Sequence, residues 1–224
     1  MAGAKAVHII RLIAIPTVLT LAVTILRVVG ELKHWPTLGF NTAAGGGGAL
    51  VGISWLPIVF GPYFALKLAA AGDGPASSGK AIGFAFLGLV VYFLAIALFA
   101  ITVRHASLLT LAAFLLMLIA GFIPLIGWRS LGRVLFAYAF AARIPVLIVM
   151  YLAMSGNGGA GWGTHYDAVN PVLAHLSFGR KYLYAAILPQ LTMWIGWTAI
   201  LGAIFGTLVA ALAGRGKQAA PAAV

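Results

Sequence analysis

Six long apolar runs fill most of the sequence and restrict its fold more than any other feature. Five of them have 21–23 residues and the last has 30, and a helix of about 20 residues crosses the ~30 Å hydrocarbon core of a bilayer. We therefore predict an all-α, polytopic integral membrane protein, a single domain over residues 1–224 with six transmembrane helices. Prolines inside several of these runs predict kinked spans. The predicted spans are residues 9–29, 49–71, 81–103, 108–128, 134–154 and 184–213.

The composition supports this class and excludes several others. Of the 224 residues, 63% are hydrophobic and 8% are charged, whereas soluble domains carry about 25% charged residues. The net charge of +11 is spread over the ends of the apolar runs, so we predict contact with the lipid bilayer and not with nucleic acid. The chain has no cysteine. This excludes disulfides, cysteine-bound iron–sulfur clusters and covalently attached haem, and we expect no cofactor.

The distribution of lysine and arginine predicts the orientation. With six spans both termini lie on one side, and that side carries eight basic residues against five on the other. The excess predicts cytoplasmic termini in a bacterial inner (plasma) membrane, with the first and last loops outside. The eight are Lys5, Arg11, Lys67, Lys80, Arg129, Arg133, Arg215 and Lys217; the five are Arg27, Lys33, Arg104, Arg180 and Lys181.

The polar residues of the first span lie on one face of the predicted helix. Thr17, Thr20, Thr24, Arg27 and Glu31 fall within an arc of roughly 80° at about 100° per residue. Two interpretations remain open at this point. The threonines hydrogen-bond to carbonyls of their own helix, or the stripe forms the polar wall of a path into the membrane.

Arg143 lies near the middle of the fifth run, which contains no other charged residue. An arginine at this depth costs roughly 2.5–3.5 kcal/mol on insertion scales, so it requires hydrogen-bond acceptors. We expect it to point into the bundle, toward the first, second or last span. The candidate acceptors are the carbonyl of Ala141 freed by Pro145, Gln190 of the last span, the threonine stripe, or a molecule outside the chain. Arg143 is thus either a structural residue or an anion-binding one.

The two long loops and the outer ends of the spans contain most of the tryptophans. This pattern is typical of an aromatic belt and also of a docking surface for another membrane subunit. The residues assigned to such a surface are Trp35, Asn41, Trp162, His165, Tyr166, Asp167, Trp194 and Trp197. A run of four glycines at 45–48 in the first loop is expected to be a flexible connector.

Few residues in the chain could perform catalysis, since it has three acids and five histidines. The favoured interpretation is a non-enzymatic accessory or assembly subunit of a membrane complex, docking through its outer aromatic face. One alternative is a small channel or carrier for anionic or neutral polar solutes, lined by the threonine stripe and Arg143. Another is a metal-dependent membrane enzyme, because imidazole and carboxylate groups suit zinc. Its weak candidate ligands are His34, His165, Asp167 and His175.

Overall fold

The computed structural model describes residues 8–46, 48–103 and 108–219, and within these it contains helices and loops but no strand. Five helical segments are long and apolar enough to cross a membrane, and a sixth apolar helix, α2, is shorter. The helices are α1 (Ile9–Leu32), α2 (Pro57–Ala70), α3 (Ser78–Thr102), α4 (Leu108–Phe122), α5 (Pro124–Gly127), α6 (Arg129–Ser155), α7 (Phe178–Tyr182) and α8 (Trp194–Ala219). Two π-helical turns, Leu183–Ile187 and Pro189–Met193, join α7 to α8.

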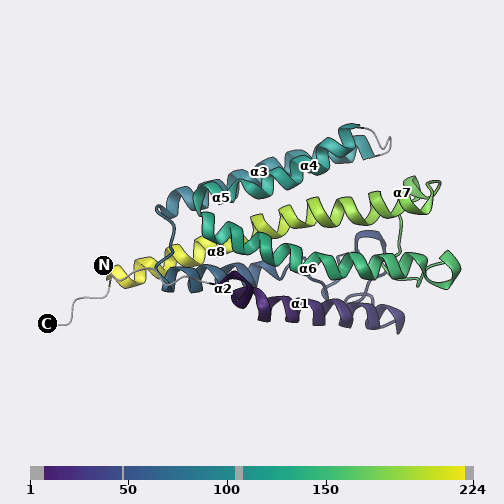
Figure 1. Cartoon of the computed structure of the whole chain (residues 1–224), viewed down its shortest axis with the longest axis horizontal. Helices are drawn as coiled ribbons and strands as arrows, with labels where there is room; N and C mark the ends of the chain where they lie inside the picture. Colours follow the sequence, from purple (N-terminus) through teal and green to yellow (C-terminus); the bar gives the residue numbers. More distant parts are fainter. Residues whose placement is uncertain (1–7, 47, 104–107, 220–224) are drawn as a thin grey trace.

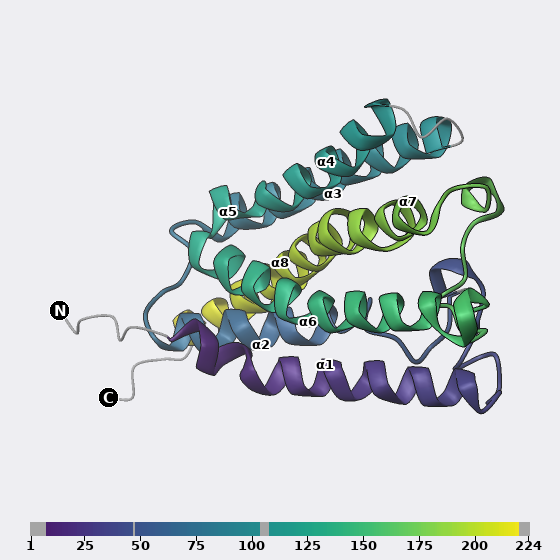
Figure 2. The ribbon, with the colours of Figure 1, turned by 45° about the vertical axis from the view of Figure 1, so that its right-hand side comes forward.

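The helices run along the long axis of the molecule (Figure 1). Helices α3, α4 and α5 lie on one side of α6 and α8, and α1 and α2 lie on the other side (Figure 2). Helix α1 begins and α8 ends at the same end of the bundle, here called the terminal end. The opposite end, here called the loop end, carries the segments 33–56 and 156–177.

Helix α8 is the central element, because it packs against α2, α3, α4 and α6. Within an 18-residue apolar stretch of its segment, Phe178–Gly214, 56% is buried. The corresponding share is 22% in α1 and in α3. Glycines allow its neighbours to approach closely, as is common in membrane bundles. A Cβ added at Gly61 of α2 would lie 2.2 Å from the carbonyl oxygen of Gly202, and one at Gly196 would lie 2.3 Å from that of Met117.

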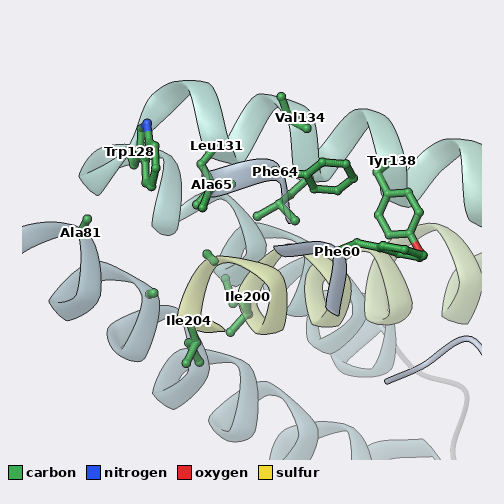
Figure 3. Packing of buried hydrophobic residues seen from close by; sticks show 14 of the residues in the cluster. Phe60, Phe64, Ala65, Ala81, Trp128, Leu131, Val134, Tyr138, Ile200 and Ile204 are labelled. Carbon is green, nitrogen blue, oxygen red and sulfur yellow. The ribbon is translucent and has the colours of Figure 1, made fainter. Parts of the chain in front are cut away.

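An aromatic cluster joins α2 to α6 in the core (Figure 3). The Tyr138 ring lies 5.5 Å, centroid to centroid, from each of the rings of Phe60 and Phe64. The Tyr138 hydroxyl lies 2.7 Å from the hydroxyl of Thr20 in α1. Tyr138 therefore connects three helices, and its polar group is satisfied within the core.

The structure corrects the second predicted span. A helix was expected over residues 49–71, but α2 begins at Pro57 and residues 49–56 are not helical. Proline suits the first turn of a helix because it lacks an N–H, which has no partner within the helix at that position. The glycines at 48 and 52 make a helix less favourable in the residues before Pro57. Pro57 therefore begins the helix and cannot kink it.

The other boundaries differ from the expected ones by smaller amounts. Pro124 begins the short helix α5, so the fourth predicted span is divided after Phe122, while α6 begins at Arg129. Helices α1, α2 and α6 continue through an internal proline, and the kinks expected there stay predictions. Of the basic residues that carry the orientation argument, Lys5 and Arg104 lie outside the described residues, as do the side chains of Arg215 and Lys217.

Candidate functional site

A cavity of about 560 Å³ lies at the loop end of the bundle. Its volume falls within the range of about 300–1,000 Å³ that is usual for small-molecule sites. Side chains from α1, α3, α4 and α6, from both loop-end segments and from the π-helical turns form its walls. Most of these walls are apolar, and the polar side chains include Thr24, Arg27, Arg143, His165 and Gln190.

Arg143 lies on the wall of this cavity and is only 4% exposed. Its Nη1 donates a hydrogen bond to Oε1 of Gln190 at 3.3 Å, and its guanidinium lies 4.9 Å from the ring centroid of Trp194. Its Nε–H is buried and has no partner in the described part of the chain. Arg143 thus points into the bundle, as expected, and of the four candidate acceptors Gln190 of the last helical segment is the one that accepts its hydrogen bond.

No acid of the chain neutralises Arg143. All three acids lie within the described ranges, and the two ion pairs found there both involve Glu31 with other partners. Asp73 lies in the connection between α2 and α3, away from the cavity lining, and Asp167 bonds within its own loop. Arg143 is thus a buried cation without a counter-charge in the part of the chain that the structure describes.

Gln190 owes its position to a π-helical turn. The turn Pro189–Met193 begins with a proline, which donates no backbone hydrogen bond. A π-helical turn places one more residue in the turn than an α-helix does, and such turns are frequent at functional sites. Among the described residues, the side-chain amide nitrogen of Gln190 donates one hydrogen bond, to the Met150 sulfur at 3.6 Å. Its donor capacity is therefore weakly used.

Arg27, the second arginine on the cavity wall, is bonded to the chain through all three of its guanidinium nitrogens. Its Nε pairs with the Glu31 carboxylate, and its Nη1 donates to the carbonyl of Val51. Its Nη2 donates to the carbonyls of Asn41 at 2.8 Å and Gly46 at 3.0 Å. The guanidinium therefore binds the non-helical segment before α2, whose carbonyls lack helix partners. Non-helical backbone inside an apolar bundle requires such internal partners.

Glycines make room for this guanidinium. A Cβ at Gly46 would lie 3.2 Å from Nη2 of Arg27, and one at Gly52 would lie 3.4 Å from Nη1. Gly46 also has a φ of +83°, which other residues rarely adopt. The connector predicted at 45–48 is thus anchored at Gly46, while residue 47 lies outside the described residues.

Glu31 joins the end of α1 to the last loop. Its side chain is 0% exposed and lies between Arg27 and His165. One carboxylate oxygen accepts from the backbone N–H of His165 at 2.8 Å, and the other lies 2.6 Å from Nδ1 of the same residue. This buried carboxylate has several hydrogen-bond partners, as buried charges require.

Tyr166 and Asp167, which follow His165 in the segment 156–177, also form hydrogen bonds that fix this segment. Burial raises the pKa of the Tyr166 phenol, so it stays protonated and donates to the carbonyl of Thr24 at 3.4 Å. Asp167 accepts from the N–H groups of Gly163 and Thr164, at 2.9 and 2.8 Å. The Asp167 carboxylate therefore stabilises a turn and does not meet Glu31.

The threonine stripe of α1 mainly bonds to its own helix. Thr20 donates to the carbonyl of Pro16 at 2.7 Å, and Thr24 donates to that of Thr20 at 3.0 Å. This confirms the first interpretation of the stripe for these two residues. The Thr17 hydroxyl is buried and has no partner among the described residues. Of the three threonines, only Thr24 lines the cavity.

The residues assigned to a docking surface lie in different environments. Trp35 is 41% exposed and packs edge-on against Phe40, whereas Tyr166 is buried. Trp194 packs on Arg143, and Trp197 donates to the carbonyl of Ser54 at 3.0 Å. Of the remaining assigned residues, Trp162 and His165 are partly buried, and Asn41 binds Arg27 through its carbonyl.

The candidate metal ligands are not brought together. Across residues 8–46, 48–103 and 108–219, no group of three or more histidine, cysteine, aspartate or glutamate residues could hold a metal ion. His165 is paired with Glu31, and Asp167 with its own turn. His34 and His175 are exposed on separate loops.

Comparison of the chain with protein-family models, with curated proteins and with solved structures finds no match. Function must therefore be inferred from the cavity and its two arginines. Sequence patterns identified both arginines and Gln190, but they missed the carbonyls of Gly46 and Val51 that bind Arg27. The nearest sequence signal was an arginine–glutamate pair close to a glycine run.

Proposed function

We propose that this protein is an integral membrane protein that binds an anionic molecule in the loop-end cavity, with Arg143 holding the charge. The single observation that carries the proposal is the buried Arg143 guanidinium on the cavity wall, with its Nε–H unpartnered among the described residues. A buried charge without a counter-charge is costly, and an anion that enters the cavity removes that cost.

The chemistry of the site favours a carboxylate or phosphate group. Arginine presents several N–H donors in a planar fork that matches both groups in a bidentate manner. The Arg143–Gln190 hydrogen bond of 3.3 Å is long, so an anion competes with it readily. The amide of Gln190 then supplies a second donor. Arg27 contributes less, because its own chain already occupies most of its donors.

Binding within the cavity explains more of the polar residues than docking at an aromatic face. Trp194 and Tyr166, both assigned to that face, line the cavity wall. An accessory subunit would need a continuous exposed patch, and Trp35 is the most exposed of its assigned tryptophans. A carrier for anions is one way in which the proposed binding would be used. A path along Thr17 and Thr20 has less support, since neither lines the cavity.

Replacement of Arg143 by leucine tests the proposal directly. We expect Arg143→Leu to weaken anion binding by roughly ten- to a hundredfold, since hydrogen bonds to charged groups contribute about 1.5–3 kcal/mol. The measurement is isothermal titration of the protein in lipid nanodiscs with a short-chain carboxylate, inorganic phosphate and a long-chain fatty acid. Arg143→Lys keeps the positive charge but lacks the planar guanidinium, so its affinity for the anion should lie between those of the wild type and Arg143→Leu.

The matched control is Arg133→Leu, the same substitution at an exposed position of the same helix. It should bind as the wild type does. Thermal unfolding of Arg143→Leu checks that the bundle remains folded. If none of the three probes binds more weakly to Arg143→Leu than to Arg133→Leu, the proposed function is wrong.

A further inference from the structure

A second hollow, a groove of about 390 Å³, lies on the side of the bundle between α2, α3 and α8. Its walls are almost entirely apolar, and they include Trp55, Ile58, Phe93, Ile96, Trp197 and Leu201. Three of these side chains are open to the surroundings of the bundle: Trp55 is 44% exposed, Ile58 37% and Phe93 54%.

The polar groups of three aromatic side chains around this groove are satisfied within the chain. The Tyr92 hydroxyl donates to the carbonyl of Met193 at 3.0 Å, and Trp197 Nε1 donates to that of Ser54 at 3.0 Å. Trp55 Nε1 donates to the carbonyl of Leu50, also at 3.0 Å. The groove therefore offers a ligand an almost entirely apolar surface, which suits a hydrocarbon chain better than a polar solute.

The groove adjoins the loop-end cavity. Ser54, Met193 and Trp194 line both hollows. The Arg143 Cζ atom lies 4.9 Å from the centroid of the Trp194 ring. Trp194 also forms part of the groove wall. The apolar groove thus shares part of its wall, including Trp194, with the cavity that contains the buried cation.

The position of the groove along the helices indicates which kind of molecule fills it. Phe93 and Ile96 lie near the middle of α3, and Arg143 lies near the middle of α6. In a bundle that crosses a membrane, these positions are level with the hydrocarbon chains and not with the headgroups. A ligand that reaches Arg143 through the groove arrives from the apolar layer.

From this arrangement we infer that the ligand is a single-chain anionic amphiphile of the fatty-acid class. Its carboxylate pairs with Arg143, and its hydrocarbon chain lies in the groove between α2, α3 and α8. This inference rests on the proposed function and names its ligand class. The carboxylate is inferred from charge complementarity, since no acid among the described residues pairs with Arg143. The hydrocarbon chain is inferred from the apolar groove next to the cavity.

Photo-crosslinking tests the position of the chain. The probe is a long-chain fatty acid with a diazirine near its terminal methyl group, added to the protein in zwitterionic nanodiscs. After irradiation, mass spectrometry should place crosslinks on Ile58, Phe93 or Ile96. Ile58→Trp fills the groove and should reduce crosslinking by about tenfold. The matched control is Leu66→Trp, at an exposed position of the same helix outside both hollows, and it should leave crosslinking unchanged.

Each result decides between the two proposals. Groove crosslinks that Arg143→Leu removes, and that the corresponding uncharged alcohol probe does not reproduce, support the inference. Crosslinks that persist in Arg143→Leu overturn it, because the groove then holds bulk lipid. Arg143-dependent binding of a short-chain carboxylate or phosphate without groove crosslinks also overturns it, and leaves the proposed function standing. Absence of any Arg143-dependent binding refutes both.

Discussion

Arg27→Leu is expected to lower the free energy of unfolding by roughly 3–5 kcal/mol, the usual cost of removing one partner from a buried ion pair. The loss has two physical causes. Glu31, with a side chain that is 0% exposed, keeps only His165 as a charged or polar side-chain partner. In addition, the carbonyls of Asn41, Gly46 and Val51 each lose one hydrogen bond, and that of Gly46 keeps the N–H of Ala49 at 3.1 Å.

Thermal unfolding in detergent micelles would measure this loss. The control is Lys33→Leu, which removes the same charge from an exposed position just beyond α1. A double variant, Arg27→Leu with Glu31→Gln, should recover part of the stability because no buried charge is then left unpaired. Equal melting of Arg27→Leu and Lys33→Leu would show that the guanidinium does not hold the non-helical segment.

Gly61→Val should separate α2 from α8 and destabilise the bundle by about 3 kcal/mol, the upper part of the usual overpacking range. The new Cβ would lie 2.2 Å from the carbonyl oxygen of Gly202 and 2.6 Å from its Cα. Backbone atoms cannot rotate away as a flexible side chain would, so the helices must move apart. A Cβ at Gly206 would lie 2.8 Å from the carbonyl oxygen of Gly61, so the contact is close from both sides.

The matched control for this variant is Gly83→Val in α3, where an added Cβ meets nothing within 4 Å. Both substitutions place a β-branched residue inside a helix, so the intrinsic helix propensity changes equally. Thermal unfolding of the two variants under identical conditions isolates the packing effect. A Gly61→Val protein that melts together with Gly83→Val would disprove a close α2–α8 contact.

Two buried arginines with the same exposure, 4%, have different roles in this fold. The chain supplies Arg27 with one carboxylate and three carbonyls. For Arg143 it supplies one long hydrogen bond and an aromatic ring. Both guanidinium groups are buried, so both lose their hydration. They differ in how many of their N–H donors have a hydrogen-bond partner within the described chain. This difference underlies the proposed roles of Arg27 as a structural residue and Arg143 as the ligand-binding one.

Much of the fold is predictable from the lengths of the apolar runs. The expected segments 9–29, 81–103, 108–128, 134–154 and 184–213 each correspond to a helical segment long and apolar enough to cross a membrane. The prediction was wrong for residues 49–56, where apolar residues continue but the helix does not. Hydropathy reports how apolar a segment is. It does not report whether a distant side chain will satisfy the backbone carbonyls in place of a helix.

The sequence by itself determined the order of the long apolar segments, because helix length follows from local composition. It also placed one arginine near the end of the first segment and another in the middle of the fifth. Only the tertiary structure decided which arginine keeps free donors. The carbonyl partners of Arg27 lie 14, 19 and 24 residues away along the chain, and Gln190 lies 47 residues from Arg143. Contacts over such separations depend on how the helices pack, and hydropathy and spacing carry no information about that packing.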